Sequence, residues 1–227
     1  MFTNFYTYIF FYILIISCSM GYGLAINSIS KKFKITDNLG YVGLIGVLFL
    51  IIYAYLSSIF IHHGQFHNSI ILIIGLIFFV KFYFFNSKKK KEQWTYFFII
   101  FLILLMGAFF LKTHDDFPYY HFSYSHYLTE NSLIFGMGHF NLGYRTPSSI
   151  FYLNSLFYLP FVKYFMFHMP AILIMGFSNL VLLIKLKKNI ANNQINFITY
   201  FTLLVLIFIN IFFYRISEHG TDKSAMI

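Results

Sequence analysis

The sequence predicts an all-α polytopic membrane protein with about six transmembrane helices. Hydrophobic residues make up 59% of the 227 residues and charged residues only 10%, and the mean hydropathy is +0.72. A soluble domain of this composition would lack the polar surface needed to cover its core. Several windows also hold the roughly 18 to 20 apolar residues needed to cross about 30 Å of hydrocarbon. The chain is therefore expected to be an integral membrane protein.

Six apolar runs are expected to cross the bilayer, and each one ends at a polar or lysine-rich gap. In chain order they cover about residues 5–26, 39–61, 69–85, 94–111, 171–184 and 195–213. Residues 150–168 interrupt this series, because Asn154, Pro160 and Lys163 lie among their aromatic residues. We expect this segment to be an interfacial or re-entrant helix in the main outer loop rather than a further span.

The polar gaps divide the chain into parts of one helical domain. Residues 1–92 hold the first three spans, residues 93–184 hold a central part, and residues 185–227 hold the last span and a polar tail. The central part contains the longest polar interval, residues 112–149. We expect this interval to form the main outer loop.

The basic residues indicate the orientation of the spans. Eleven of the sixteen lie in short gaps between apolar runs, at Lys31, Lys32, Lys34, Lys81, Lys88, Lys89, Lys90, Lys91, Lys185, Lys187 and Lys188. The positive-inside rule places these gaps in the cytoplasm, and alternation then places the main outer loop outside. Five of the seven acidic residues, which were not used to set the orientation, also fall outside. The net charge of +9 is therefore explained by lysines that orient the spans in the lipid bilayer. We expect no nucleic-acid partner.

Asp115 and Asp116 are the strongest candidates for chemistry. They follow the fourth apolar run, within His114-Asp115-Asp116-Phe117-Pro118-Tyr119-Tyr120-His121. Ionisable residues at a membrane helix are costly and usually functional. Adjacent helical residues point about 100° apart, so one could act as a base while the other caps a helix, binds a cation or stays in water. The structural alternative is a helix end broken by Pro118, although Asp disfavours a helix C-terminus.

The main outer loop is also rich in histidine and tyrosine, including His114, Tyr119, His121, His126 and His139. Histidine and carboxylate together could hold a divalent cation, of which Mg²⁺ and Mn²⁺ are the best matches. The spacing fits no defined zinc pattern. The alternative, which we take as the default for most of these residues, is an interfacial belt with polar tips among the lipid headgroups. The same default applies to the histidines of residues 62–67.

Residues 136–149 combine three glycines with Arg145, one of only two arginines in the chain. Glycine lets the backbone approach a ligand closely, and the planar guanidinium can grip phosphate oxygens with two hydrogen bonds. The segment could therefore hold a phosphate-bearing lipid or sugar donor. An equally good interpretation is a turn-rich connector whose arginine reaches lipid headgroups. The second arginine, Arg215, lies in the polar tail, where it could complete an extracytoplasmic site or simply belong to the chain end.

Together these motifs resemble the GT-C class of polytopic membrane glycosyltransferases. In that class an acidic pair in the first large outer loop supplies the catalytic base, and the sugar donor is a polyprenyl phosphate. The matching positions are Asp115 and Asp116, and residues 138–152 resemble the segment that follows in bacterial members. The resemblance covers about residues 94–179. The sequence differs from the class in two ways: three further spans precede the matching part, and the chain is short. We therefore expect an N-terminal fragment of a longer enzyme.

The resemblance implies inverting sugar transfer on the extracytoplasmic face of a bacterial inner membrane, in cell-envelope polysaccharide biosynthesis. Asp115 or Asp116 would deprotonate the acceptor hydroxyl. A divalent cation, or Arg145 and Arg215, would stabilise the lipid-phosphate leaving group. The remaining residues expected to contact the substrate are His114, Tyr119, His121 and His139.

Two other classes of function stay open. One is a non-catalytic accessory protein, such as a scaffold or a lipid-linked sugar flippase, although transport is disfavoured because the spans carry almost no charge. The other is a polysaccharide polymerase or ligase, which would rely on arginine and histidine in the outer loop.

Overall fold

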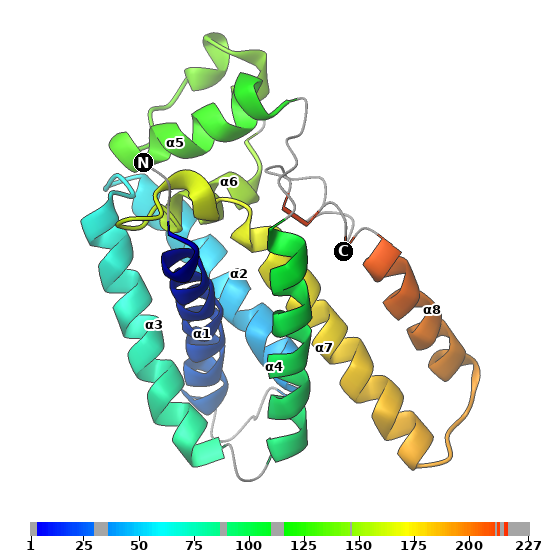
Figure 1. The fold of residues 1–227 in the computed structure, drawn as a ribbon. Helices are drawn as coiled ribbons and strands as arrows, with labels where there is room; N and C mark the ends of the chain where they lie inside the picture. Colours follow the sequence, from blue (N-terminus) through cyan, green and yellow to red (C-terminus); the bar gives the residue numbers. More distant parts are fainter. Residues whose placement is uncertain are drawn as a thin grey trace.

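The computed structural model describes residues 4–29, 36–86, 90–109, 116–145, 147–211, 213 and 216–217. Over these residues the chain is helical and forms no strand, which confirms the all-α prediction (Figure 1). The helices are α1 (Phe5–Ile29), α2 (Leu39–Ser58), α3 (Gln65–Asn86), α4 (Lys91–Ala108), α5 (Phe122–Glu130), α6 (Ser149–Leu156), α7 (Met169–Ala191) and α8 (Phe197–Ile211).

Five segments are long and apolar enough to cross a membrane, as expected of an integral membrane protein. They are α1 to α4 and the segment Tyr164–Ala191 that contains α7, with mean hydropathies between 1.3 and 2.2. These are the first five of the predicted spans. The sixth, α8, is described over 15 residues. At a rise of about 1.5 Å per residue this helix is about 22 Å long, shorter than the roughly 30 Å hydrocarbon layer.

The described lysines Lys90, Lys91, Lys187 and Lys188 lie at one end of the helical bundle. At this end Lys90 pairs with Asp37, with 3.6 Å between Nζ and Oδ1, and Lys187 pairs with Glu92. α1, α3 and α7 end here, whereas α2, α4 and α8 begin here (Figure 1). We call it the lysine end, and we call the opposite end, which carries α5, α6 and the 59–64 connection, the loop end. Alternation of the spans is thus confirmed, and the two acids expected on the basic side pair with lysines.

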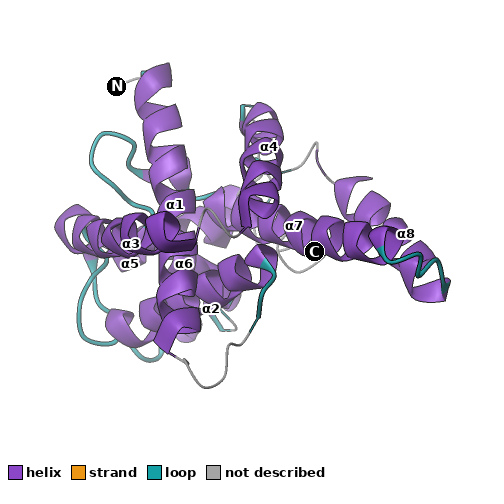
Figure 2. Ribbon diagram, turned by 90° about the horizontal axis from the view of Figure 1, so that it is seen from below, coloured by secondary structure: helices purple, strands orange, loops and turns teal. Residues whose placement is uncertain are grey.

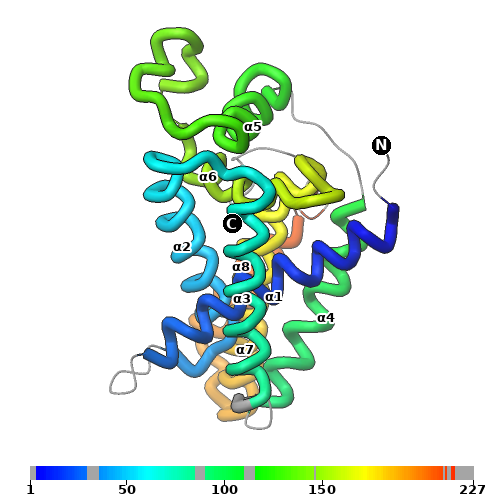
Figure 3. Tube along the Cα trace, turned by 90° about the vertical axis from the view of Figure 1, so that its left-hand side faces the viewer, coloured from blue at the N-terminus to red at the C-terminus, as the bar shows by residue number. Residues whose placement is uncertain are grey.

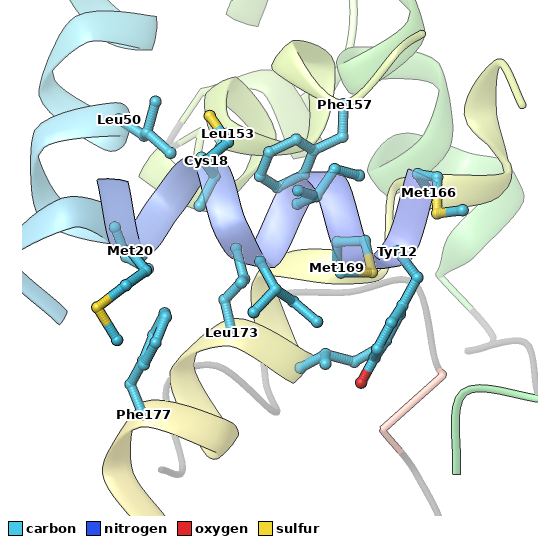
Figure 4. Close-up of a cluster of buried hydrophobic side chains, with 14 of the residues drawn as sticks. Tyr12, Cys18, Met20, Leu50, Leu153, Phe157, Met166, Met169, Leu173 and Phe177 are labelled. Carbon is cyan, nitrogen blue, oxygen red and sulfur yellow. The ribbon is translucent and has the colours of Figure 1, made fainter. Parts of the chain in front are cut away.

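α1 lies at the centre of the bundle and crosses it obliquely, packed against α2, α3 and α7 (Figure 3). Glycines let the backbones come close: a Cβ atom on Gly46 of α2 would lie 1.9 Å from the Ser19 carbonyl oxygen of α1. A Cβ atom on Gly21 would lie 2.0 Å from the Gly75 carbonyl oxygen of α3. Close approach at small residues is a common way for helices to associate in membranes. Larger side chains, among them Met20 and Phe177, fill the space beside these contacts (Figure 4).

α7 and α8 extend to one side of the group formed by α1 to α4 (Figure 2). α8 packs along α7, and the side chains of Asn179 and Asn210 join the two helices through a reciprocal amide pair with N to O distances of 3.2 and 2.8 Å. The face of α8 turned away from α7 is apolar and exposed. The apolar face of α8 is therefore the part of the bundle least covered by other described helices.

The segment expected to be a helix over residues 150–168 is helical only in its first half. α6 ends at Leu156, and the chain then turns, with positive φ at Phe161 and Lys163. Pro160 explains the difference, because proline lacks the N–H needed to continue a helix. All residues from Ile150 to Phe157 are buried in contact with the rest of the protein. α6 therefore inserts between other helices at the loop end.

Candidate functional site

Asp116 is the described member of the acidic pair, and it begins a helix instead of ending one. It directly precedes a π-helical turn, Phe117–His121, that leads into α5, with Pro118 in the first turn. Proline fits that position because its missing N–H has no partner to lose there, which corrects the expectation that Pro118 breaks a helix. A carboxylate at a helix N-terminus is favourable. His114, Asp115 and Arg215 lie outside the described residues.

The carboxylate of Asp116 is half-buried and is held from within its own turn. The hydroxyl of Tyr120 donates to Asp116 Oδ2 at 3.1 Å, and the backbone N–H of Tyr120 donates to the Asp116 carbonyl at 3.2 Å. Tyr120 therefore orients the acidic residue relative to α5.

The acidic motif packs against the glycine-rich segment that contains Arg145. The ring of Tyr120 fills the space where a side chain on Gly143 would lie, because a Cβ atom there would be 2.6 Å from Tyr120 Cγ. One residue further along, the Tyr144 hydroxyl donates to Ser123 Oγ of α5 at 2.9 Å. Two motifs that are some twenty residues apart in the sequence are thus adjacent in space.

A pocket of about 480 Å³ opens at the loop end, and we call it the tyrosine pocket. Three helices each supply a tyrosine to its lining: Tyr55 of α2, Tyr124 of α5 and Tyr152 of α6. The glycine-rich segment supplies backbone and side chains from residues 136–139, together with Tyr144 and Arg145. The apolar side chains of Ile134 and Phe135 also line the pocket and are exposed, Phe135 to 82%.

The hydroxyls of Tyr124 and Tyr152 form a buried pair with 2.8 Å between the oxygens. Burial raises the pKa of both tyrosines, so both keep their protons at neutral pH. One of the two hydroxyl hydrogens makes the bond between them, and the other remains available as a donor. The ring of Tyr55 packs edge-on against that of Tyr152, with 5.0 Å between the centroids. The pair is therefore a fixed donor on the lining of the pocket.

Arg145 is anchored at its Nε atom, which donates to the Gly138 carbonyl oxygen at 3.3 Å. Gly138 leaves room for the arginine stem, because a Cβ atom there would lie 2.9 Å from Arg145 Cγ. Gly136 has a φ of +91°, a conformation that favours glycine. Among the ion pairs of the described residues none involves Arg145. Its terminal amino groups therefore have no carboxylate partner among the described residues.

The structure brings some of the expected binding residues together and separates others. His139 and Arg145 line the tyrosine pocket. Tyr119 is 72% exposed and His121 is 2% exposed, and neither lines this pocket. The ring of His121 instead packs between Tyr120 and Phe151, with centroid distances of 4.4 and 5.4 Å.

His63 corrects the expectation of an interfacial belt, because its side chain is fully buried. Its Nδ1 atom lies 2.6 Å from Ser155 Oγ and its Nε2 atom 2.8 Å from Ser57 Oγ. A neutral imidazole donates from one ring nitrogen and accepts at the other, so His63 can bond to both serines at once. Burial, together with smaller contributions from the neighbouring His67 and His62, lowers the pKa of His63 to about 3. His63 is a neutral connector between α2 and α6.

Asn68 of α3 extends this connection. Its Nδ2 atom donates to the carbonyls of His63, Ser155 and Tyr158 at distances between 2.7 and 3.0 Å. The backbone N–H of His63 in turn donates to the Leu128 carbonyl of α5 at 2.8 Å. The helices that supply Tyr55, Tyr124 and Tyr152 are thus held together by one polar network, which no motif in the sequence indicated.

A metal site does not follow from this geometry. Within the described part of the chain, no group of three or more histidine, cysteine, aspartate or glutamate side chains is placed to hold a metal ion. The divalent cation expected from the sequence stays a prediction.

Comparisons with known proteins place the chain in a family without assigning it a function. Neither the curated proteins nor the solved structures contain a match to this chain. One family model, described as Domain of unknown function (DUF8201), matches residues 6–227. The protein therefore belongs to the DUF8201 family.

Proposed function

We propose that this protein is a membrane glycosyltransferase that moves a sugar from a polyprenyl-phosphate donor to an acceptor hydroxyl. The observation that carries the proposal is the packing of the acidic motif against the glycine-rich segment that contains Arg145. A potential base and a potential phosphate-binding group are thereby gathered at one end of an apolar bundle. In this proposal the loop end faces the outside of a bacterial inner membrane.

The chemistry requires one base and one anion-binding group. Asp115 or Asp116 takes the proton of the acceptor hydroxyl while its oxygen attacks the anomeric carbon of the donor. The bond between that carbon and the phosphate oxygen breaks, and the lipid phosphate leaves with the electron pair. Arg145 stabilises the negative charge of this phosphate. No second carboxylate is needed, because a phosphate leaves readily as an anion.

A second candidate is a polysaccharide polymerase or ligase. It is favoured by the joint presence of His139 and Arg145 on the tyrosine pocket, whereas Asp116 does not line that pocket. In such an enzyme the histidine and arginine, rather than the acidic pair, would carry the reaction.

Sugar transfer in proteoliposomes distinguishes the two candidates. The complete protein is incubated with radiolabelled polyprenyl-phosphate hexoses, and label in the acceptor fraction is counted. For the glycosyltransferase we expect the Asp115→Asn/Asp116→Asn double variant to lose transfer by about 100-fold or more, the typical contribution of a positioned base. Wild-type transfer by this double variant, together with loss in His139→Gln, would reject the acidic base in favour of the polymerase or ligase.

A further inference from the structure

The tyrosine pocket combines three kinds of chemistry that one ligand would have to match. Arg145 offers terminal amino groups without a carboxylate partner in the described chain. The Tyr124 and Tyr152 pair offers one hydroxyl hydrogen beside aromatic rings. Ile134 and Phe135 offer an exposed apolar border. A purely apolar ligand would leave the arginine and the hydroxyl unused, and a bare inorganic ion would leave the aromatic lining unused.

The volume sets a further limit. A pocket of about 480 Å³ lies within the range of small-molecule sites, about 300 to 1,000 Å³. It can hold a sugar ring and a phosphate group, but not an extended polymer. Tyrosine suits a sugar, because its ring packs on the C–H face while its hydroxyl bonds to ring oxygens or hydroxyls.

We propose that the tyrosine pocket binds the phosphate ester of a ring sugar, with the phosphate on Arg145 and the sugar ring against the exposed side chain of Tyr55. This inference rests on the proposed function, for which it specifies the place and the chemistry of donor binding. The guanidinium binds two phosphate oxygens, since its Nε atom is already fixed to Gly138. The free hydroxyl hydrogen of the tyrosine pair binds a sugar oxygen. The phosphate ester comes either from a lipid carrier or from a soluble sugar phosphate, and the exposed apolar border favours the lipid.

The hydroxyl pair makes a specific prediction about paired substitutions. In the pair one hydrogen is shared and one is free, so Tyr124→Phe or Tyr152→Phe alone leaves one donor in the pocket. Each single variant should weaken binding less than about 3-fold, whereas the double variant should weaken it by about 10-fold, the range of one neutral hydrogen bond. A purely structural role would instead give single variants that weaken binding as much as the double variant.

Calorimetry on the complete protein in nanodiscs tests the site with two sets of probes. The soluble set is glucose 1-phosphate and other hexose 1-phosphates, and the lipid set is polyprenyl-phosphate hexoses placed in the same discs. Arg145→Gln should weaken binding by about 10- to 100-fold, as expected for hydrogen bonds to a charged group. Lys163→Gln is the matched control, because it removes a positive charge from the loop end outside the pocket, and Tyr158→Phe is the control for the tyrosines.

The outcomes separate this inference from the proposed function. The site is supported if a probe of either set binds to the wild type and to Lys163→Gln but not to Arg145→Gln. The set to which the bound probe belongs identifies the source of the phosphate. Binding that survives Arg145→Gln, or no binding of any probe, overturns it. Asp116→Asn should bind like the wild type. If sugar transfer survives in the aspartate variants while probe binding still depends on Arg145, the proposed base is rejected and the proposed binding site is kept.

Discussion

His63 illustrates how a single buried side chain can position several helices at the loop end. Both ring nitrogens have serine partners, one on α2 and one on α6, and the backbone N–H reaches α5. A neutral histidine satisfies this arrangement, since one ring nitrogen donates to a serine and the other accepts from a serine. Because Tyr55 and Tyr152 belong to the same two helices, the histidine also fixes the distance across the tyrosine pocket.

His63→Ala should lower the free energy of unfolding by about 2 to 4 kcal/mol, because it leaves a cavity and removes a partner from the hydroxyls of Ser57 and Ser155. The measurement is thermal or denaturant unfolding of the purified protein in detergent. His62→Ala is the matched control, since that side chain is exposed and its loss should change the stability by less than about 0.5 kcal/mol. Equal stability of the two variants would contradict the connecting role of His63.

The pH dependence of stability follows from the same residue. The pKa of His63 falls from its usual 6.5 to about 3 in the folded protein, so between these values the unfolded chain binds more protons than the folded one. Stability should therefore decrease as the pH falls below about 6.5, by up to about 1.4 kcal/mol per pH unit. The measured quantity is the difference between wild type and His63→Gln, which cannot take up this proton. A difference that stays constant from pH 7 to pH 5 would refute the neutral buried histidine.

At the scale of the elements, close glycine contacts explain why α1 can occupy the centre of the bundle. Gly23 and Gly46 meet where α1 and α2 cross, and a Cβ atom on either would overlap backbone of the other helix. The spans themselves were predicted from apolar run length, whereas the end of α6 at Leu156 was not, since a helix was expected over residues 150–168. The pairing of helices was not, since it depends on contacts between distant segments, although the spacing of Gly40, Gly43 and Gly46 in an apolar span was a signal for close packing.

Gly46→Ala should destabilise the protein by about 1 to 3 kcal/mol, because the added methyl group would lie 1.9 Å from the Ser19 carbonyl and cannot turn away. The comparison is Gly64→Ala, whose methyl group would meet the exposed side chain of His62 at 3.1 Å and the Thr129 carbonyl oxygen at 3.9 Å. The stability of both variants is measured by unfolding in detergent. If Gly64→Ala lowers the stability as much as Gly46→Ala, the contact between α1 and α2 does not explain the destabilisation by Gly46→Ala.

The candidate site shows what sequence can and cannot provide at this scale. Arg145 and His139 were predicted as binding residues, and in the structure both line the tyrosine pocket. Tyr55 could not be assigned to it, because it lies in an apolar span where a tyrosine is usually an interfacial residue. Tyr152 lies on a helix whose burial depends on three other helices. The chemical roles of Asp115 and Asp116 stay predictions.

At the scale of the whole molecule, the two ends differ in charge and in content. The lysine end pairs its two acidic residues with lysines, whereas the loop end carries the acidic motif and the tyrosine pocket (Figure 1). Apolar helices long enough to span a bilayer separate these ends. A donor bound in the tyrosine pocket would therefore react on one side of the membrane only.

Labelling of single cysteines tests which side of the membrane the loop end faces. Cys18 is the sole cysteine and is buried in α1, so a membrane-impermeant maleimide should not react with the wild type. In intact cells Glu130→Cys at the loop end should be labelled, and Asn192→Cys at the lysine end should be labelled only after permeabilisation. The opposite pattern would place the loop end in the cytoplasm and reject an extracytoplasmic reaction.

The most direct test of the central claim is the initial rate of sugar transfer by the complete protein carrying Asp115→Asn or Asp116→Asn singly. Only one of the two adjacent carboxylates is expected to act as the base, so the two variants should differ, and one should lose about 100-fold or more in rate. Glu130→Gln, which changes an exposed acid of the same loop outside the motif, should keep the wild-type rate. Wild-type rates in both aspartate variants would contradict the account.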